Sequence, residues 1–175
     1  MNTVVIYKSK YGSTKTYAEW ISKELNCEIY DAKNIKADDL LKYDTIIYGG
    51  GLYAEMIAGI SLITKNFEKI KNKKIAVFST GLTPPDCREY YDKMVPEKNF
   101  KPYMLDKIKI FNFPGKMIID ELSFPHKAAI KALKKLMSSK ENPTDMEKLL
   151  IKLCDADGDF TDKEAINDLI SYIKN

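Results

Sequence analysis

The stretch VVIYKSKYGSTKTYAEWI, residues 4–21, joins a strand-like segment to a helix-like one through a turn crowded with hydroxyl groups. Its first part, Val4–Tyr7, has the β-branched and aromatic character of a buried strand. The turn centres on a single glycine, Gly12, and its hydroxyl groups belong to Ser9, Tyr11, Ser13, Thr14 and Thr16. A strand that passes directly into a helix in this way predicts an α/β fold.

Four more apolar segments follow along the chain, and segments with helical spacing separate them. They are Cys27–Tyr30, Thr45–Tyr48, Ile75–Phe78 and Ile108–Phe113. Several are apolar nearly throughout, which is typical of parallel strands in a sheet that is covered on both faces. We therefore predict a doubly wound, five-stranded parallel sheet. Because no repeat, low-complexity segment or linker interrupts the pattern, we expect residues 1–175 to form a single domain.

The last third of the chain holds more helical sequence than a minimal five-stranded fold needs. Helices are predicted from about Pro125 to Met137, near Thr144–Leu153 and from about Thr161 to Ile173. Thr161 and Glu164 have the spacing of a capping box for the last helix. The acidic segment at 155–164 lacks the spacing of a calcium-binding loop, because its glycine is fourth and its glutamate tenth. It is better interpreted as a polar turn, and we predict no metal site.

Composition excludes several classes of protein. The net charge of +3 is too small to indicate nucleic-acid binding. No stretch approaches the roughly 18 consecutive apolar residues of a membrane span, and a secretory signal pattern is not apparent. A single histidine rules out a multi-histidine metal centre, and three widely spaced cysteines indicate a reducing compartment. We therefore expect a cytoplasmic protein.

The hydroxyl-rich turn is a candidate phosphate site. It falls at the carboxyl end of the first strand, where parallel α/β sheets bind their ligands. The N–H groups and the dipole of the following helix favour an anion there, and Gly12 lets the backbone approach it closely. The alternative is that Ser13 or Thr14 merely caps the helix.

Two further loops are predicted at the same edge of the sheet. YGGGLYAEM (48–56) follows the third strand, and FSTGLTPPD (78–86) follows the fourth. Leu52, Tyr53 and Leu82 are suited to cover the faces of a flat ring. The glycines that would let the main chain approach such a ring are Gly49, Gly50, Gly51 and Gly81. Plain turns would explain these glycines equally well.

These three segments, taken in order, resemble flavodoxins. SKYGST (9–14) is similar to their phosphate loop, although Tyr11 stands where threonine is usual. YDTIIYGGGLY (43–53) and KKIAVFSTGL (73–82) fall where flavodoxins hold the isoalloxazine ring. The resemblance implies strand order 2-1-3-4-5 and FMN as the cofactor. The FMN-binding residues that it implies are Ser9, Lys10, Tyr11, Gly12, Ser13, Thr14, Gly50, Gly51, Leu52, Tyr53, Ala54, Ser79, Thr80, Gly81 and Leu82.

The resemblance also implies a feature of the second loop. Flavodoxins turn a backbone carbonyl toward the reduced flavin there, and glycine makes that turn easy. In this chain Tyr53, Ala54 and Glu55 occupy the corresponding positions. A β-carbon penalises the positive φ that such a turn requires, so we expect the turn to be costly here.

The C-terminal part resembles a narrower branch of the same family. The segments at 111–137 and 143–173 are similar to those of menaquinone-dependent protoporphyrinogen dehydrogenase. This resemblance implies a flavin-dependent oxidoreductase or electron-transfer protein whose partner is a quinone, another small-molecule substrate or a redox protein. Its catalytic residues are not identified. An ordinary flavodoxin shuttle is one alternative, although such shuttles are usually strongly acidic. A non-catalytic domain that has lost its flavin is another.

The predicted helix at 126–137 is basic and amphipathic. Its lysines are Lys127, Lys131, Lys134 and Lys135, and its apolar residues lie mostly on the opposite side. A solvated face over a packed face explains this pattern. Peripheral contact with the inner face of the membrane is the alternative, and access to a quinone would give such contact a purpose.

Overall fold

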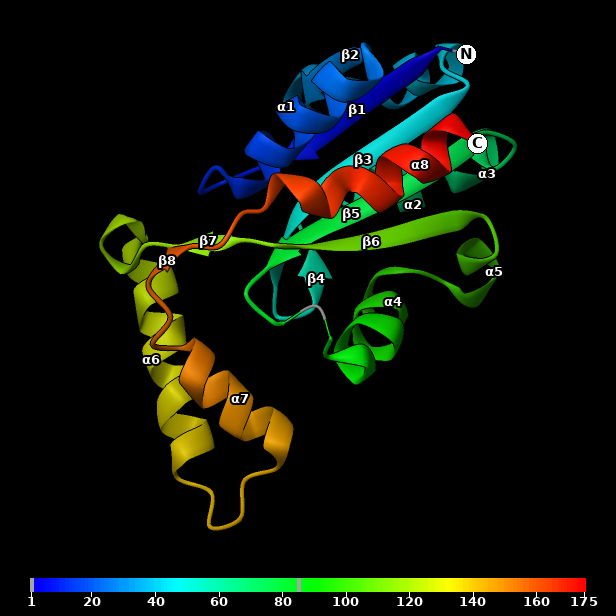
Figure 1. The fold of residues 1–175 in the computed structure, drawn as a ribbon. Coiled ribbons are helices and arrows are strands. Elements are labelled where there is room, and N and C mark those ends of the chain that lie inside the picture. The colour runs from blue at the N-terminus through cyan, green and yellow to red at the C-terminus, as the bar shows by residue number, and fades with distance from the viewer. Residues whose placement is uncertain (1, 85) are drawn as a thin grey trace.

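The computed structural model describes residues 2–84 and 86–175 and is organised around one parallel sheet (Figure 1). The strands of this sheet lie in the order β2-β1-β3-β5-β6, with every neighbouring pair parallel. Their bounds are β1 Thr3–Lys8, β2 Glu28–Asp31, β3 Thr45–Tyr53, β5 Lys74–Gly81 and β6 Ile108–Pro114. The short strand β4 (Met56–Ile57) pairs only with β3 and lies off this path, so β5 and β6 are the fourth and fifth strands of the predicted order 2-1-3-4-5. The predicted five parallel strands and their order are therefore confirmed.

The central strands are buried on both faces, as their apolar sequences predict. Ile46, Ile47 and Tyr48 of β3 are fully buried, and so are Ile75 and Val77 of β5. Because successive side chains of a strand point to opposite faces, this burial contributes to two separate cores, one on each side of the sheet. Burial of apolar surface is the dominant favourable contribution to folding.

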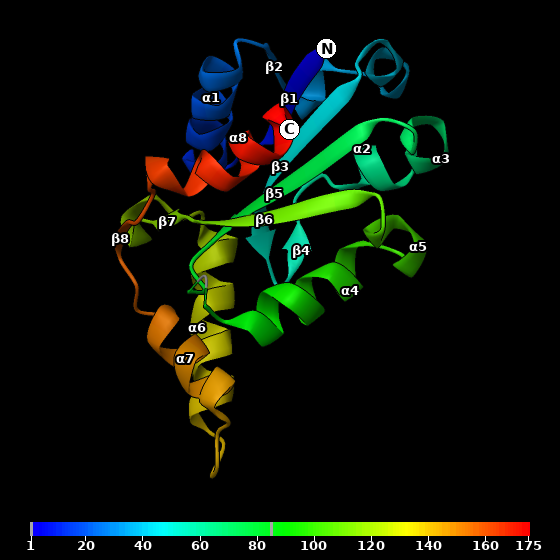
Figure 2. The same cartoon turned by 45° about the vertical axis from the view of Figure 1, so that its right-hand side comes forward.

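Helices cover both faces of the sheet (Figures 1 and 2). The helices α1 (Ser13–Leu25) and α8 (Asn167–Lys174) contribute to one core. The other core receives α3 (Phe67–Ile70), α4 (Val95–Asn99) and the segments η2 (Ala37–Lys42) and η3 (Glu89–Met94), which precede β3 and α4. The remaining elements of this part of the chain are the helices α2 Ser61–Thr64 and α5 Pro102–Leu105 and the 3₁₀ turn η1 Ala32–Asn34.

The glycine run after Tyr48 belongs to a strand and not to a loop. β3 continues to Tyr53 and then pairs antiparallel with the short strand β4 (Met56–Ile57). A Cβ on Gly49 would lie 2.1 Å from the ring of Phe78, and one on Gly50 would lie 2.6 Å from a backbone oxygen of the β4 segment. These two glycines therefore permit close packing inside the fold. The prediction that the third strand ends at Tyr48 is wrong for this reason.

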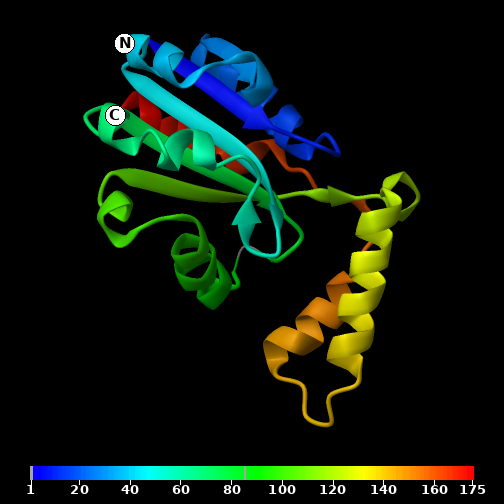
Figure 3. The same cartoon turned by 180° about the vertical axis from the view of Figure 1, so that it is seen from behind.

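After β6 the chain leaves the sheet and forms a helical arm, residues 124–153 (Figure 3). The arm consists of α6 (Phe124–Ser138) and α7 (Asp145–Leu153), and neither helix has a buried residue. A two-stranded ribbon of β7 (Lys116–Met117) and β8 (Gly158–Asp159), together with the turn η4 Ile119–Glu121, joins the arm to the sheet domain. The two extra helices that the sequence predicts at this point are confirmed.

The last helix begins later than predicted. A short 3₁₀ turn, η5 (Lys163–Ile166), precedes α8, and its cap is Asp162 instead of Thr161. The Asp162 carboxylate accepts the N–H of Glu164 at 2.9 Å, and the backbone N–H of Asp162 donates to the Tyr17 hydroxyl at 2.9 Å. This contact with α1 places Asp162 at the cap, so the predicted capping box of Thr161 and Glu164 is wrong.

None of the helices within residues 2–84 and 86–175 combines the length and hydropathy that crossing a membrane requires.

Candidate functional site

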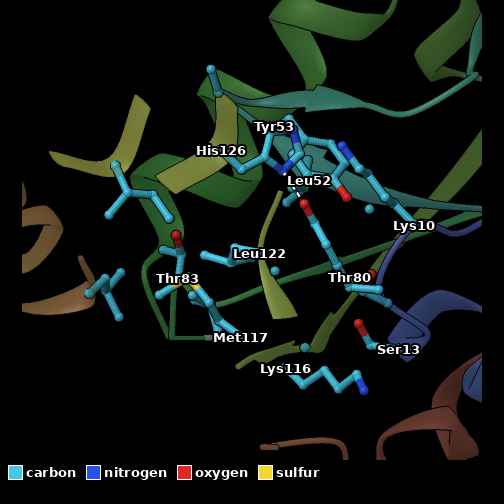
Figure 4. Close-up of a pocket in the computed structure, with 18 of the residues that line it drawn as sticks. Lys10, Ser13, Leu52, Tyr53, Thr80, Thr83, Lys116, Met117, Leu122 and His126 are labelled. Carbon is cyan, nitrogen blue, oxygen red and sulfur yellow. Dashed lines mark hydrogen bonds between the residues drawn. The ribbon is translucent and has the colours of Figure 1, made fainter. Parts of the chain in front are cut away.

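A cavity of about 470 Å³ lies at the carboxyl edge of the sheet, where β1, β3 and β5 end (Figure 4). This is the edge at which parallel α/β sheets bind ligands. Its walls come from the hydroxyl-rich turn after β1, the ends of β3 and β5, the ribbon strand β7 and the helical arm. Segments far apart in the sequence therefore meet in one pocket.

The start of α1 is open to a ligand. Gly12 is the residue before the helix, with φ of 99°, and no side chain caps the first turn. Ser9 Oγ accepts the N–H of Gly12 at 3.1 Å and so shapes the loop. The alternative that Ser13 or Thr14 caps the helix is therefore wrong. The first N–H groups and the positive end of the helix dipole favour an anion here.

Hydroxyl groups and lysines surround this opening. The hydroxyls of Thr14 and Thr80 lie 2.8 Å apart, and both residues are almost fully buried. Lys116, from β7, passes beside Gly12, with its Cε 3.5 Å from the position that a Cβ on Gly12 would occupy. The ammonium of Lys116 also lies 3.5 Å from the carboxylate of Glu121. Two donor types, hydroxyl and ammonium, thus converge on one anion site.

Away from the hydroxyl-rich turn, backbone borders the part of the pocket that we call the ring slot, which is lined by Leu52, Tyr53, Gly81, Leu82 and Gly115. The carbonyl oxygen of Gly81 accepts the N–H of Gly115 at 2.7 Å, and a Cβ on Gly115 would lie 3.3 Å from the Gly81 backbone. Leu52 lies beside Gly81, since a Cβ on Gly81 would be 3.3 Å from Leu52 Cδ1, and Tyr53 keeps 37% of its surface exposed. A flat apolar ring with polar edges fits such a slot.

The turn between β3 and β4 holds two non-glycine residues at positive φ. Ala54 and Glu55 have φ of 47° and 62°, as a two-residue hairpin of this type requires. Asn99 supports the turn, since its side chain accepts the N–H of Ile57 at 2.8 Å and donates to the carbonyl of Glu55 at 2.6 Å. The fold thus adopts positive φ here even though both residues carry a β-carbon.

Replacing Glu55 by glycine should stabilise the protein. A residue with a β-carbon at positive φ costs roughly 1 kcal/mol or more, and glycine removes that cost while keeping the backbone contact to Asn99. We expect the free energy of unfolding in urea to rise by about 1 kcal/mol. Met56→Gly, in the adjacent strand, is the control and should lower it. A Glu55→Gly protein no more stable than the parent would contradict strain at this turn.

Most residues that the flavodoxin resemblance implies do line the cavity. They are Ser9, Lys10, Tyr11, Ser13, Thr14, Gly51, Leu52, Tyr53, Ala54, Thr80, Gly81 and Leu82. Three others lie outside its lining. Gly12 donates its N–H to Ser9 within the loop, and Gly50 packs against the β4 segment. The buried Ser79 hydroxyl donates to Asn112 Oδ1 at 2.6 Å. These three therefore support the site through the backbone and the sheet.

The structure adds a wall that sequence reasoning missed. It is mainly apolar and comes from the loop after β5, η3, the ribbon strand β7 with the residue before it, the segment before α6, and the arm with the residue after it. Its residues are Thr83, Tyr90, Gly115, Lys116, Met117, Leu122, His126, Ala129, Ile130, Leu133, Leu150, Leu153 and Cys154. The amphipathic pattern at 126–137 was the available signal, but it does not reveal what the apolar face contacts.

A polar cluster joins the hydroxyl-rich turn to the arm. The hydroxyl of Tyr11 lies 2.7 Å from Nδ1 of His126 and 3.2 Å from the hydroxyl of Ser123, and Lys10 donates to Ser123 at 3.2 Å. Burial, and then the charge of Lys10, lowers the pKa of His126. Burial alone would raise the pKa of Tyr11, but the hydrogen bonds with Ser123 and the charge of Lys10 outweigh it and lower that pKa.

The acidic segment at 155–164 is engaged in contacts within the protein. Asp155 pairs with Lys134 of α6 at 2.6 Å, and Asp157 accepts the N–H of Ile119 at 2.9 Å. Within the described part of the chain, no group of three His, Cys, Asp or Glu residues is arranged to hold a metal ion. The interpretation of this segment as a polar turn agrees with these contacts.

Fold and site together define a class of protein: a doubly wound α/β domain whose sheet edge combines an open helix start with a backbone-bordered slot. The chain belongs to the flavodoxin domain family, which it matches over residues 4–146. Among curated proteins, an uncharacterised protein of Methanocaldococcus jannaschii is 34% identical over 87 residues, which cover 48% of this chain. The match spans only 57% of the length of that relative.

Three solved structures are among those similar to this chain. The Trp repressor binding protein of Bacillus subtilis is 14% identical, with a TM-score of 0.49, over 66% of this chain and 85% of its own. A flavodoxin from the domain Archaea is 15% identical, with a TM-score of 0.46, over the whole of both chains. A flavoprotein of Lactobacillus acidophilus, in complex with FMN, is 18% identical, with a TM-score of 0.42, over 65% of this chain and 91% of its own.

The residues of the pocket fit FMN. Its terminal phosphate matches the open start of α1 with the hydroxyls of Ser13 and Thr14 and the ammonium of Lys116. Its ring system matches the ring slot, whose lining combines the Gly81 and Gly115 backbone with the side chains of Leu52 and Tyr53. Both parts of the cofactor are therefore accommodated by neighbouring regions of one cavity.

Proposed function

We propose that this protein is an FMN-dependent oxidoreductase in which an apolar second ligand binds beside the flavin. The observation that carries this proposal is the extension of the cavity beyond the flavodoxin loops onto the apolar face of the arm. When bound, FMN supplies the redox chemistry, and the protein supplies phosphate anchoring, ring contacts and exclusion of water. If the arm had no role in ligand binding, its apolar side chains would not be expected to line the cavity.

The evidence for an apolar ligand comes from four side chains of the arm: Ile130 and Leu133 of α6, and Leu150 and Leu153 of α7. These four side chains line the same cavity as Tyr53 and Leu82. An apolar chamber beside a flavin site suits a ligand that leaves water for the protein, because apolar surface removed from water contributes about 25 cal/mol per Å². The chamber therefore favours a hydrophobic ring substrate over a purely protein redox partner.

The net charge supports an oxidoreductase more than an ordinary shuttle. The arm contains seven lysines against three carboxylates, although the whole chain has a net charge of only +3. A basic surface beside the flavin differs from the acidic docking surface that is usual in flavodoxin shuttles. Within the oxidoreductase class, the resemblance of segments 111–137 and 143–173 supports the protoporphyrinogen dehydrogenase branch and a quinone as the acceptor.

A peripheral contact with an anionic membrane is part of this proposal. Phe124 and Leu136 of α6 keep 84% and 59% of their surface exposed, next to the lysines of the same helix. Apolar and basic groups together are the combination that binds a membrane surface. The protein should sediment with vesicles containing anionic lipid and remain in solution with neutral ones. Equal behaviour with both would count against membrane contact.

The function is tested by comparing two electron acceptors. The purified protein, loaded with FMN and reduced anaerobically with dithionite, is mixed with 2,3-dimethyl-1,4-naphthoquinone or with cytochrome c in a stopped-flow instrument. We expect rapid oxidation by the quinone. Leu133→Asp, which places a charge in the apolar wall, should slow that reaction at least tenfold without changing the reaction with cytochrome c.

Leu136→Asp is the matched control, because Leu136 is on the same helix but outside the cavity lining. It should react with the quinone as the parent does. A shuttle would instead reduce cytochrome c faster than the quinone and would be indifferent to Leu133→Asp. A protein that takes up no FMN would support the alternative of a domain that has lost its flavin.

A further inference from the structure

His126, the single histidine of the chain, lies where the hydroxyl-rich turn meets the apolar wall. Its ring is at 5.2 Å from that of Tyr53 and at 5.5 Å from that of Tyr11, measured between centroids. Figure 4 shows it beside Tyr53 among the side chains that line the cavity. His126 therefore lies where α6 of the arm meets Tyr53 and the hydroxyl-rich turn.

The hydrogen bonds around Tyr11 favour one tautomer of His126. The backbone N–H of Ser123 donates to the Tyr11 hydroxyl oxygen at 3.3 Å, so that the hydroxyl proton of Tyr11 is available to Nδ1 of His126 at 2.7 Å. A neutral histidine whose Nδ1 accepts a hydrogen bond carries its proton on Nε2. Burial and the charge of Lys10 lower the pKa of His126 and so favour this neutral form.

His126 shares the lining of the cavity with apolar side chains. Among the residues that the structure describes, Nε2 has no hydrogen-bond partner, and Leu122, Ile130 and Leu133 line the same cavity. A donor at the edge of an apolar chamber gains most from a ligand that offers one acceptor atom on an otherwise apolar body.

We propose that His126 donates its Nε2–H to a carbonyl oxygen of a hydrophobic ring ligand seated against the arm, and that Tyr11 is the positioning residue that fixes this tautomer. The inference rests on the proposed function and adds the residue that selects the ligand. It also explains why a tyrosine replaces the usual threonine at position 11, because only the longer side chain reaches the arm. The ligand class is a planar apolar ring that bears a carbonyl group.

The tautomer is tested without any ligand. With one histidine in the chain, the ¹⁵N resonances of its imidazole are unambiguous in the apoprotein. At pH 7.5 we expect the pattern of a neutral ring protonated on Nε2. Tyr11→Phe, which removes the hydroxyl and keeps the ring, should convert it to a mixture of both tautomers. A parent protein protonated on Nδ1, or a pattern unchanged by Tyr11→Phe, would overturn the role of Tyr11.

Ligand selection is tested with two probes that differ only in their carbonyl groups, 2,3-dimethyl-1,4-naphthoquinone and 2,3-dimethylnaphthalene. The methyl groups hinder addition to Cys154, which lines the cavity. Equilibrium dialysis against oxidised, FMN-loaded protein gives the ratio of the two affinities. A net hydrogen-bond contribution of about 1 kcal/mol corresponds to about fivefold. The ratio of quinone affinity to naphthalene affinity should be about fivefold larger for the parent than for His126→Phe.

His126→Gln provides the rescue, because its amide N–H₂ restores a donor and it should recover most of the preference. If His126→Phe and the parent show the same preference, the role of His126 in selection is wrong, although the proposed function stands. If neither probe binds to FMN-loaded protein, the apolar chamber of the proposed function fails instead. A merely structural role of His126 would change both affinities equally and would also overturn the inference.

Discussion

Replacing both Ser9 and Thr14 by alanine should weaken FMN binding at least tenfold while the sheet stays folded. Both hydroxyls lie at the open start of α1, and the oxygen of Ser9 already accepts the N–H of Gly12, so its own proton is free for the phosphate. A hydrogen bond to a charged group contributes about 1.5–3 kcal/mol. Loss of these two donors leaves the helix N–H groups, the Ser13 hydroxyl and Lys116 to hold the anion.

The measurement is a titration of apoprotein with FMN, followed by quenching of flavin fluorescence. Thr16→Ala is the matched control, since its hydroxyl bonds the Gly12 carbonyl within the helix and does not line the cavity. It should bind FMN like the parent. A Ser9→Ala, Thr14→Ala protein with the parental affinity, together with an unchanged circular dichroism spectrum, would show that the phosphate lies elsewhere.

Gly49→Ala should cost the protein about 3 kcal/mol of folding free energy. The added methyl group would lie 2.1 Å from the ring of Phe78, which is fully buried and packs against Phe113 at 5.4 Å between centroids. Overpacking of a tight core usually costs about 1–3 kcal/mol, and a rigid ring held by neighbours has little room to move. Urea unfolding of the apoprotein measures the loss.

Gly51→Ala, two residues along the same strand, is the control for this prediction. Its added Cβ would lie 3.2 Å from the ring of Tyr53, a partly exposed side chain that is able to shift. Its stability should fall by much less, about 1 kcal/mol at most. Equal losses at both positions would mean that Gly49 is required for strand conformation in general and not for the Phe78 contact.

The two glycines also show where sequence reasoning about the site was limited. A run of glycines after an apolar segment has the same appearance whether a ligand or a neighbouring side chain requires the space. Gly51 lines the cavity, whereas Gly49 and Gly50 make room for Phe78 and for the β4 segment. Only the register of β3 against β5, which pairs Gly49 with Phe78, distinguishes them.

The amino-acid sequence by itself predicted the parallel sheet and the hydroxyl-rich turn that lines one end of the pocket, whereas the strand order came from the resemblance to flavodoxins. The first two features depend on local patterns: apolar runs such as Val4–Tyr7, and a hydroxyl-rich turn between a strand and a helix. The same local information predicted α6 and α7, because helical spacing and the start signals of helices are contained within a few turns of chain.

Only the tertiary structure decided what those elements contact. The distance between Tyr11 and His126, 115 positions apart, and the place of Leu133 and Leu153 in the flavin cavity follow from how the ribbon β7–β8 directs the arm. An amphipathic helix specifies that one of its faces must be covered, but the hydrophobic effect is non-directional and does not specify by what. The partner of that face is therefore set by the geometry of the whole chain.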